Sequence, residues 1–155
     1  MSLHLSVRKA TEDDCKLLFD WANEPEVRKA SFSTEKIEWL GHTNWFFQKL
    51  KNPNSLILIL EADGSPAGLI RFDKDTEQNY FLISFLLDEK FRGMSLGTTL
   101  ISKGLAYLSS GQQGPIVCVG FVKKENIASQ RAFYKNEFLL ESESDDNLKF
   151  IKTIE

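Results

Sequence analysis

The fold of this 155-residue chain is decided by the stretch Asp88-Glu89-Lys90-Phe91-Arg92-Gly93-Met94-Ser95-Leu96-Gly97-Thr98-Thr99-Leu100-Ile101. Before it, the almost unbroken apolar run 81–87 is typical of a buried strand. After it, apolar residues recur at helical spacing, which predicts a helix from about Leu96 onward. The stretch therefore joins a strand to a helix through a short, basic loop that contains glycine.

This junction has the features of an anion-binding loop. Gly93 and Gly97 allow a tight turn and a close approach of the backbone to a ligand. The free N–H groups and the positive dipole end of the following helix favour a phosphate. The simpler alternative is that two glycines serve only the turn. Neither the Lys-Ser/Thr of a nucleoside-triphosphate loop nor the three-glycine dinucleotide fingerprint is present.

Length and composition predict one domain, residues 1–155, with a substantial hydrophobic core. The formal net charge of −3 argues against a general nucleic-acid-binding protein. Cys15 and Cys118 lie in expected element interiors without metal-ligand spacing, so we expect two buried thiols, no metal and a reducing compartment. Without a membrane-length apolar run or a signal-peptide core, the sequence indicates a cytoplasmic protein that does not bind membranes.

Periodicity and turn residues predict a defined order of elements along the chain. Strands are expected at 4–8, 56–60, 67–73, 81–87, 115–122, 138–140 and 148–154. Helices are expected at about 12–22, 37–51, from 96, and 127–135. Residues 26–32 fit neither pattern, and Asn23-Glu24-Pro25 is expected to end the first helix.

Two motifs in this order resemble those of the GNAT superfamily of N-acetyltransferases. Arg92-x-x-Ser95-x-Gly97 resembles the family's Arg/Gln-x-x-Gly-x-Gly/Ala loop, which binds the pyrophosphate of acetyl-CoA. The stretch 126–138 resembles the family's Asn-x-x-Ser-x-Arg…Lys-x-Gly-Phe segment. The chain departs from these patterns at Ser95 and Glu137, where the family usually has glycine.

The resemblance implies an α/β (α+β) fold with a mostly antiparallel mixed sheet of about seven strands, flanked by helices and splayed between strands four and five. It also implies that acetyl-CoA is the cosubstrate, with its pantetheine arm entering the splay. The cofactor-binding residues that it implies are Phe85, Leu86, Leu87, Arg92, Gly93, Met94, Ser95, Leu96, Gly97, Thr98, Asn126, Ser129 and Arg131, with Lys124 as an alternative nucleotide contact.

Tyr134 is the candidate general acid for the departing thiolate, because many family members carry a tyrosine in this segment. The register is open by one residue since Phe133 precedes it, and Tyr134 could equally pack on the sheet. The candidate bases are Ser84, His42, Asp73 or a water chain. His42 belongs to an aromatic helix that either packs on the sheet or lines an acceptor pocket.

The chain also shows a narrower resemblance, to the acetyltransferases of pseudaminic acid biosynthesis. It is carried by Asp20-Trp21-Ala22-Asn23, Val27-Arg28, Ser31-Phe32, Ile37, His42, Trp45-Phe46, Gly68-x-Ile70-Arg71-Phe72-Asp73 and Ile83-Ser84-Phe85. It implies a nucleotide-linked amino sugar as acceptor, acetylated on its 4-amino group, and a monomer or homodimer. The alternatives are a ribosomal-protein or peptide N-terminal acetyltransferase and a catalytically silent acyl-CoA-binding module.

Overall fold

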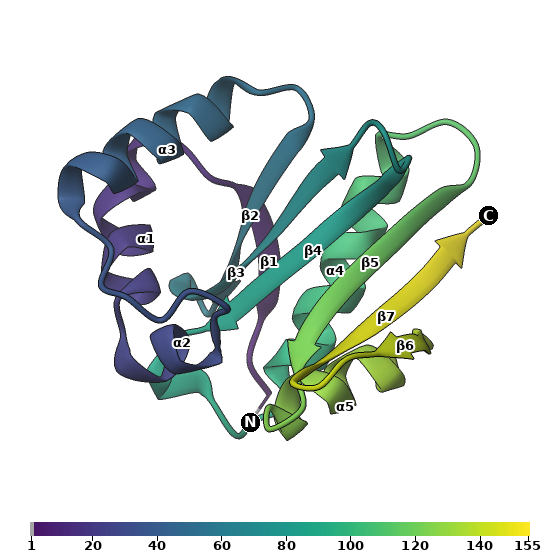
Figure 1. Cartoon of the computed structure of the whole chain (residues 1–155). Coiled ribbons are helices and arrows are strands. Elements are labelled where there is room, and N and C mark those ends of the chain that lie inside the picture. Colours follow the sequence, from purple (N-terminus) through teal and green to yellow (C-terminus); the bar gives the residue numbers. More distant parts are fainter. Residues whose placement is uncertain (1) are drawn as a thin grey trace.

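The computed structural model describes residues 2–155 as a twisted sheet with helices on both faces (Figure 1). The strands are β1 (Leu5–Lys9), β2 (Ser55–Ala62), β3 (Ser65–Asp75), β4 (Tyr80–Leu87), β5 (Ile116–Lys123), β6 (Leu139–Glu143) and β7 (Asn147–Ile154). The helices are α1 (Cys15–Ala22), α2 (Pro25–Ala30), α3 (Trp39–Lys51), α4 (Leu96–Ser110) and α5 (Ile127–Lys135), with short 3-10 turns η1 (Glu12–Asp14) and η2 (Glu89–Phe91).

The sheet contains seven strands in the order β1-β2-β3-β4-β5-β7-β6. Every neighbouring pair is antiparallel except β4 and β5, which are parallel. A parallel pair needs a long crossover, and here α4 supplies it. The mixed α/β architecture and the mostly antiparallel sheet expected from the sequence are therefore confirmed.

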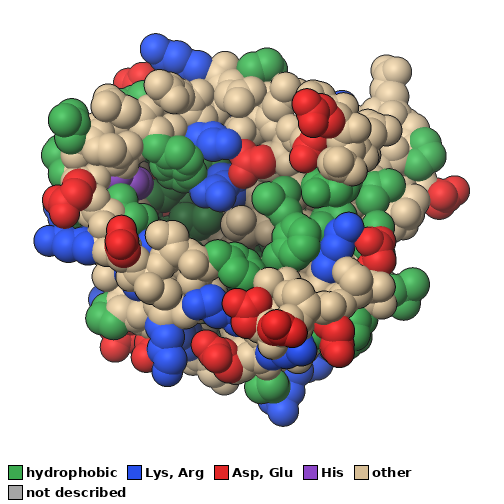
Figure 2. Space-filling view, viewed as in Figure 1, with side chains coloured by type: hydrophobic (Ala, Val, Ile, Leu, Met, Phe, Trp, Pro, Cys, Tyr) green, Lys and Arg blue, Asp and Glu red, His purple; other side chains and the backbone are tan. Residues whose placement is uncertain are grey.

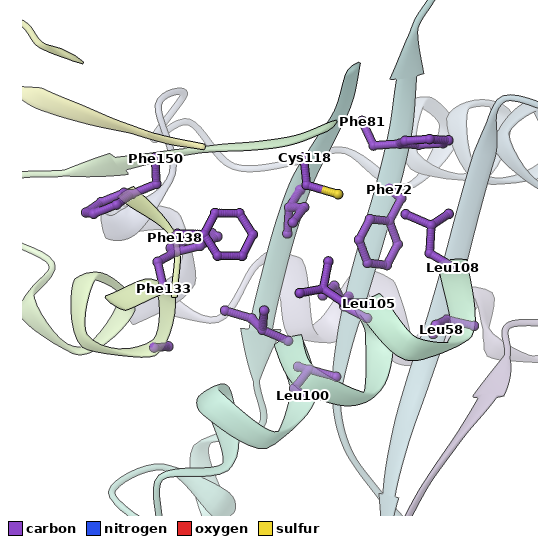
Figure 3. Packing of buried hydrophobic residues seen from close by; sticks show 14 of the residues in the cluster. Leu58, Phe72, Phe81, Leu100, Leu105, Leu108, Cys118, Phe133, Phe138 and Phe150 are labelled. Carbon is purple, nitrogen blue, oxygen red and sulfur yellow. The ribbon is translucent and has the colours of Figure 1, made fainter. Parts of the chain in front are cut away.

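Each face of the sheet has its own hydrophobic core. On the face covered by α4 and α5, strand residues such as Leu58 and Phe72 pack against Leu100 and Leu105 of α4 (Figure 3). On the opposite face, Ile57, Ile59 and Leu69 pack against α1 and α3. The two-residue periodicity of a strand sends neighbouring side chains into different cores. This is why β2 reads as an unbroken apolar run.

The largest difference from the sequence expectation is α2, because residues 26–32 were left unassigned. Pro25 begins this helix instead of only ending α1, and the Glu24 side chain caps it by accepting a hydrogen bond from the Val27 N–H. Proline is well suited to the first helical position, where its missing N–H has no partner to lose. The α1 and α2 segment and α3 together form the left side of the molecule in Figure 1.

The remaining differences are at element ends, as is usual for boundaries drawn from periodicity. α3 begins at Trp39 rather than Ile37, and β3 continues to Asp75. None of the helices in residues 2–155 combines the length and apolar character that a membrane span requires.

Candidate active site

The sheet opens between β4 and β5. Only Phe81, Leu82 and Ile83 of β4 pair with β5, opposite Cys118, Val119 and Gly120. Beyond Ile83, the segment 84–87 still pairs with β3 but has no β5 partner in the part of the chain that the structure describes. A strand edge of this kind presents backbone N–H and C=O groups to whatever lies beside it.

A cleft of about 1270 Å³ runs through this opening. On one side of the sheet it is lined by Phe85, Leu96 and Ala132, and on the other by Arg71 and Trp45. In Figure 2 the molecule is hollowed between the α1–α3 helices and the sheet, with hydrophobic, Lys and Arg side chains on the walls. The cleft therefore connects the two faces of the sheet.

The loop from β4 to α4 ends in two residues with positive φ, Gly93 at +79° and Ser95 at +60°. Ser95 is the N-cap residue of α4, but its side chain makes no capping hydrogen bond. The N–H groups of the first turn are thus not covered by a side-chain cap, in the position where a helix attracts an anion. Gly97 packs closely on β4, since a Cβ atom there would lie 3.3 Å from the Phe85 ring.

The side chain of Arg92 is held by the protein itself. Its terminal nitrogens bind both carboxylate oxygens of Glu24, and one of them also donates to the Leu87 carbonyl at 3.1 Å. The hydrogen bond from Arg92 lowers the pKa of Glu24 despite partial burial. A second contact lies nearby, where Nε1 of Trp21 donates to Asp88 at 2.8 Å. These two contacts fasten the α1–α2 segment to the loop before α4.

Most of the expected cofactor-binding residues line the cleft. They are Phe85, Leu86, Leu87, Arg92, Gly93, Ser95, Leu96, Gly97, Thr98, Asn126, Ser129 and Arg131. Met94 is half-exposed and does not line it. Asn126 has a structural task as well, because its side chain caps α5 by accepting the Ser129 N–H at 3.2 Å. Lys124 does not line the cleft, whereas its neighbour Lys123 does.

Tyr134, the expected general acid, lies outside the cleft. Its side chain is 51% exposed, and its ring packs edge-on against Phe150 with centroids 5.0 Å apart. Its neighbour Phe133 does line the cleft and also contacts Phe85 and Phe138. Successive helical residues point about 100° apart, so a shift of one residue moves a side chain out of the site. This position argues against the acid role expected from the sequence.

His42 and Ser84, two expected candidate bases, both line the cleft. His42 is only 3% exposed and lies among aromatic rings, including Trp45 and Phe46. Its Nε2 is 2.9 Å from the Cys15 carbonyl oxygen. Because a carbonyl only accepts, Nε2 carries the proton, and in the neutral ring Nδ1 holds the lone pair.

Asp73, the third candidate, is occupied by other groups. Its carboxylate accepts hydrogen bonds from Lys49, Ser55 and Arg71 at 2.7–2.8 Å. Burial alone would raise the pKa of Asp73, but the hydrogen bond from Lys49 and the charge of Arg71 outweigh it, so the pKa is lowered. Asp73 does not line the cleft. It is a weak base that orients its neighbours.

Arg71 lines the cleft, but from the sequence it was named only within the narrower resemblance and not as a site residue. Its guanidinium carbon lies 5.0 Å from the centre of the Trp45 ring. The signal was available in the alternation of β3, where Arg71 and Asp73 interrupt the apolar face begun by Leu69. Within residues 2–155, no three His, Cys, Asp or Glu side chains gather as they would around a metal ion.

Residues 15–138 match the model of the Acetyltransferase (GNAT) family. This chain belongs to the GNAT family of acetyltransferases. The matched residues include both motifs and the two strands, β4 and β5, between which the sheet opens. The protein is therefore a GNAT-family N-acetyltransferase. No curated protein sequence matches the chain.

Solved structures of several acetyltransferases share the fold of this GNAT acetyltransferase. RimL, a ribosomal L7/L12 α-N-protein acetyltransferase in complex with coenzyme A, is 16% identical with a TM-score of 0.82, covering 97% of this chain and 94% of that one. AAC(6')-Ib with ribostamycin and coenzyme A is 17% identical with a TM-score of 0.83, covering 96% and 93%. Spermidine N-acetyltransferase from Vibrio cholerae with CoA and spermine is 14% identical with a TM-score of 0.84, covering 96% and 95%.

Proposed function

We propose that this acetyltransferase transfers the acetyl group of acetyl-CoA to a primary amine of a nucleotide-linked amino sugar, the 4-amino group of a UDP-linked amino-deoxy sugar. The observation that carries the proposal is the cleft through the sheet. It joins an unpaired strand edge and an uncapped helix N-terminus to an aromatic, basic pocket on the opposite face.

The backbone supports the part of the proposal that concerns acetyl-CoA. The free edge of 84–87 would pair with the pantetheine amides, and the first turn of α4 would hold the diphosphate. A backbone N–H at the level of Phe85 would polarise the thioester carbonyl and stabilise the oxyanion. The neighbours RimL, AAC(6')-Ib and spermidine N-acetyltransferase carry coenzyme A, which supports this choice of cosubstrate.

The chemistry is a direct transfer. The amine nitrogen attacks the thioester carbonyl carbon, and the tetrahedral intermediate collapses by breaking the carbon–sulfur bond to give an amide and the CoA thiol. His42 is our candidate to accept the amine proton through Nδ1, with Ser84 positioning the amine. Since Tyr134 lies outside the cleft, water would return a proton to the sulfur.

Charge supports an acceptor that is not a polycation. The Lys and Arg residues of the cleft outnumber its two carboxylates, Glu26 and Glu125. This holds even without Arg92 and Arg131, which we assign to the cofactor, and a polyamine or aminoglycoside site would need more negative charge. The basic members are Arg28, Lys29, Arg71, Arg92, Lys123, Arg131 and Lys135.

The cofactor assignment is tested with a matched pair of variants in α4. Thr98 lines the cleft and Thr99 does not. A carboxylate in a first helical turn is favourable for the helix, so both Thr98→Asp and Thr99→Asp should fold. We expect Thr98→Asp to weaken acetyl-CoA binding at least tenfold by calorimetry while Thr99→Asp binds normally. Equal affinity of the two variants would contradict a diphosphate site at this turn.

The acceptor assignment is tested by release of the CoA thiol. UDP-linked 4-amino sugar, a peptide with a free N-terminus and spermidine are compared as acceptors, and we expect turnover with the first. Because Cys15 and Cys118 are buried, and burial raises the pKa of the Cys118 thiol to about 12, the thiol reagent should report CoA alone. Turnover with the peptide only would favour an N-terminal acetyltransferase.

The role of His42 is separable from its packing. His42→Gln keeps a group that can donate to the Cys15 carbonyl but removes the base, so turnover should fall roughly 10²–10⁴-fold with unchanged acetyl-CoA affinity. If acetyl-CoA affinity and thermal stability fell together with turnover, the role of His42 would be to pack the aromatic cluster and not to act as a base.

A further inference from the structure

Arg71 is held rigidly at the wall of the cleft. It lies on β3 directly opposite Ser84 of β4. Its Nε donates to Asp73 at 2.7 Å, while its guanidinium carbon lies over the Trp45 ring. A guanidinium fixed by one hydrogen bond and one aromatic face keeps a defined orientation.

The two terminal nitrogens of Arg71 make no hydrogen bond to any of the residues 2–155. An arginine offers five N–H donors, and Nε accounts for one of them. The Arg71 side chain is 26% exposed and lines the cleft, so its remaining donors are available to a ligand there.

The charges around Arg71 do not balance. Lys49 and Arg71 both bridge to Asp73, so two cations share a single carboxylate. The third hydrogen-bond donor to Asp73, the Ser55 hydroxyl, is neutral. Lys49 does not line the cleft. The unbalanced positive charge is therefore presented by Arg71.

We propose that Arg71 binds a phosphate group of the acceptor, and thereby selects amines that carry phosphate. The inference rests on the proposed function and names the part of the acceptor that this pocket recognises. Two parallel N–H groups of a guanidinium match two oxygens of one phosphate, and a net positive cluster favours such an anion. The site is separate from the cofactor's diphosphate site, since Arg71 lies on the face of α3 and not at the N-terminus of α4.

Binding is measured first, because it does not depend on turnover. UDP and uridine are titrated into protein saturated with coenzyme A, so that the cofactor's own phosphate site is filled. We expect the wild-type protein to bind UDP and not uridine, and Arg71→Gln to weaken UDP binding roughly 10- to 100-fold, as the loss of charge-assisted hydrogen bonds implies. Lys74→Gln is the matched control, because it removes a charge from the same strand, where Lys74 lies over the Phe81 ring outside the cleft.

Kinetics then separates a binding role from a structural one. With the UDP-linked amino sugar, Arg71→Gln should raise the acceptor KM by a similar factor while kcat and the KM for acetyl-CoA stay within about twofold. With the same amino sugar as its neutral methyl glycoside, wild type and Arg71→Gln should be alike.

The outcomes distinguish the two proposals. Equal UDP affinity of wild type and Arg71→Gln, or no UDP binding by the wild type, overturns the phosphate site whatever the protein acetylates. UDP binding that depends on Arg71, together with acetylation of peptides alone, would uphold the phosphate site and overturn the sugar-nucleotide function.

Discussion

The ring of Phe133 occupies the space that a side chain at position 120 would need, because a Cβ atom on Gly120 would lie 2.4 Å from the ring's Cζ atom. Gly120 is the last β5 residue paired with β4, at the point where the two strands part. The same ring stacks on Phe150 with centroids 5.5 Å apart (Figure 3). Phe133 thus packs the apex of the strand opening.

Gly120→Ala should disturb this apex. The added methyl group must displace the Phe133 ring, which is enclosed by Phe138 and Phe150, so we expect a loss of about 1–3 kcal/mol in unfolding free energy. Weaker acetyl-CoA binding should accompany it, since Phe133 lines the cleft. Gly41→Ala in α3 is the control, because no atom lies within 4 Å of its new Cβ and alanine favours a helix. Denaturant titrations of the two variants with similar midpoints would contradict this view of the apex.

Tyr134→Phe should leave turnover within about twofold, because the hydroxyl lies outside the cleft and the ring contact with Phe150 is kept. Steady-state thiol release at saturating substrates checks it. A fall of 10²-fold or more would restore Tyr134 as the general acid, as the sequence suggested.

Ser95→Gly and Glu137→Gly should each stabilise the protein. Ser95 has φ +60° and Glu137 has φ +65°, a region that costs a residue with a Cβ about 1–2 kcal/mol. Glycine also raises the conformational entropy of the unfolded chain, which offsets part of this relief. The expected net gain in unfolding free energy is about 0.5–1 kcal/mol. Thermal melts measure it, with Ser102→Gly inside α4 as a control that should destabilise. A lower melting temperature for both variants would show that these side chains contribute more than their backbone strain costs.

Asp14 should make stability depend on pH. Arg8 donates to both of its carboxylate oxygens at 2.8 and 2.9 Å, and this pairing lowers the pKa of Asp14 although burial opposes it. The folded pKa lies below the unfolded one, so the contribution is complete above about pH 4 and is lost as pH falls through the folded pKa.

Asp14→Asn should therefore cost about 1–3 kcal/mol at pH 7 and progressively less below pH 4. The control is Asp20→Asn, whose exposed pair with Lys16 should contribute under 1 kcal/mol. Urea titrations from pH 7 to pH 3 give both values. An Asp14→Asn deficit that stays constant across this range would mean that the cost is one of packing and not of charge.

Local patterns predicted every strand and every helix except α2, because each of those elements carried its own periodicity. The strand 81–87 and the helix from Leu96 were set by apolar spacing, and the loop between them by its glycines. The two departures from the family pattern, Ser95 and Glu137, were visible in the sequence, but their strained backbone was not. Only the folded structure shows that both residues adopt the left-handed conformation that glycine adopts readily.

The site was harder to predict because it depends on partners far apart in the chain. Arg92 meets Glu24 across 68 residues, and Lys49 meets Asp73 across 24, which no local pattern indicates. The position of Tyr134 outside the cleft was not predicted for a different reason. A helix turns so far per residue that motif spacing alone did not decide between Phe133 and Tyr134.

The cleft that crosses the sheet has a kinetic consequence. Because the two substrates enter from opposite faces, both can be bound at the same time. Both cysteine thiols are buried, so neither is exposed to carry the acetyl group as a covalent intermediate. Double-reciprocal plots at several fixed cosubstrate concentrations should then intersect, as for a ternary complex, and a family of parallel lines would speak for a covalent relay.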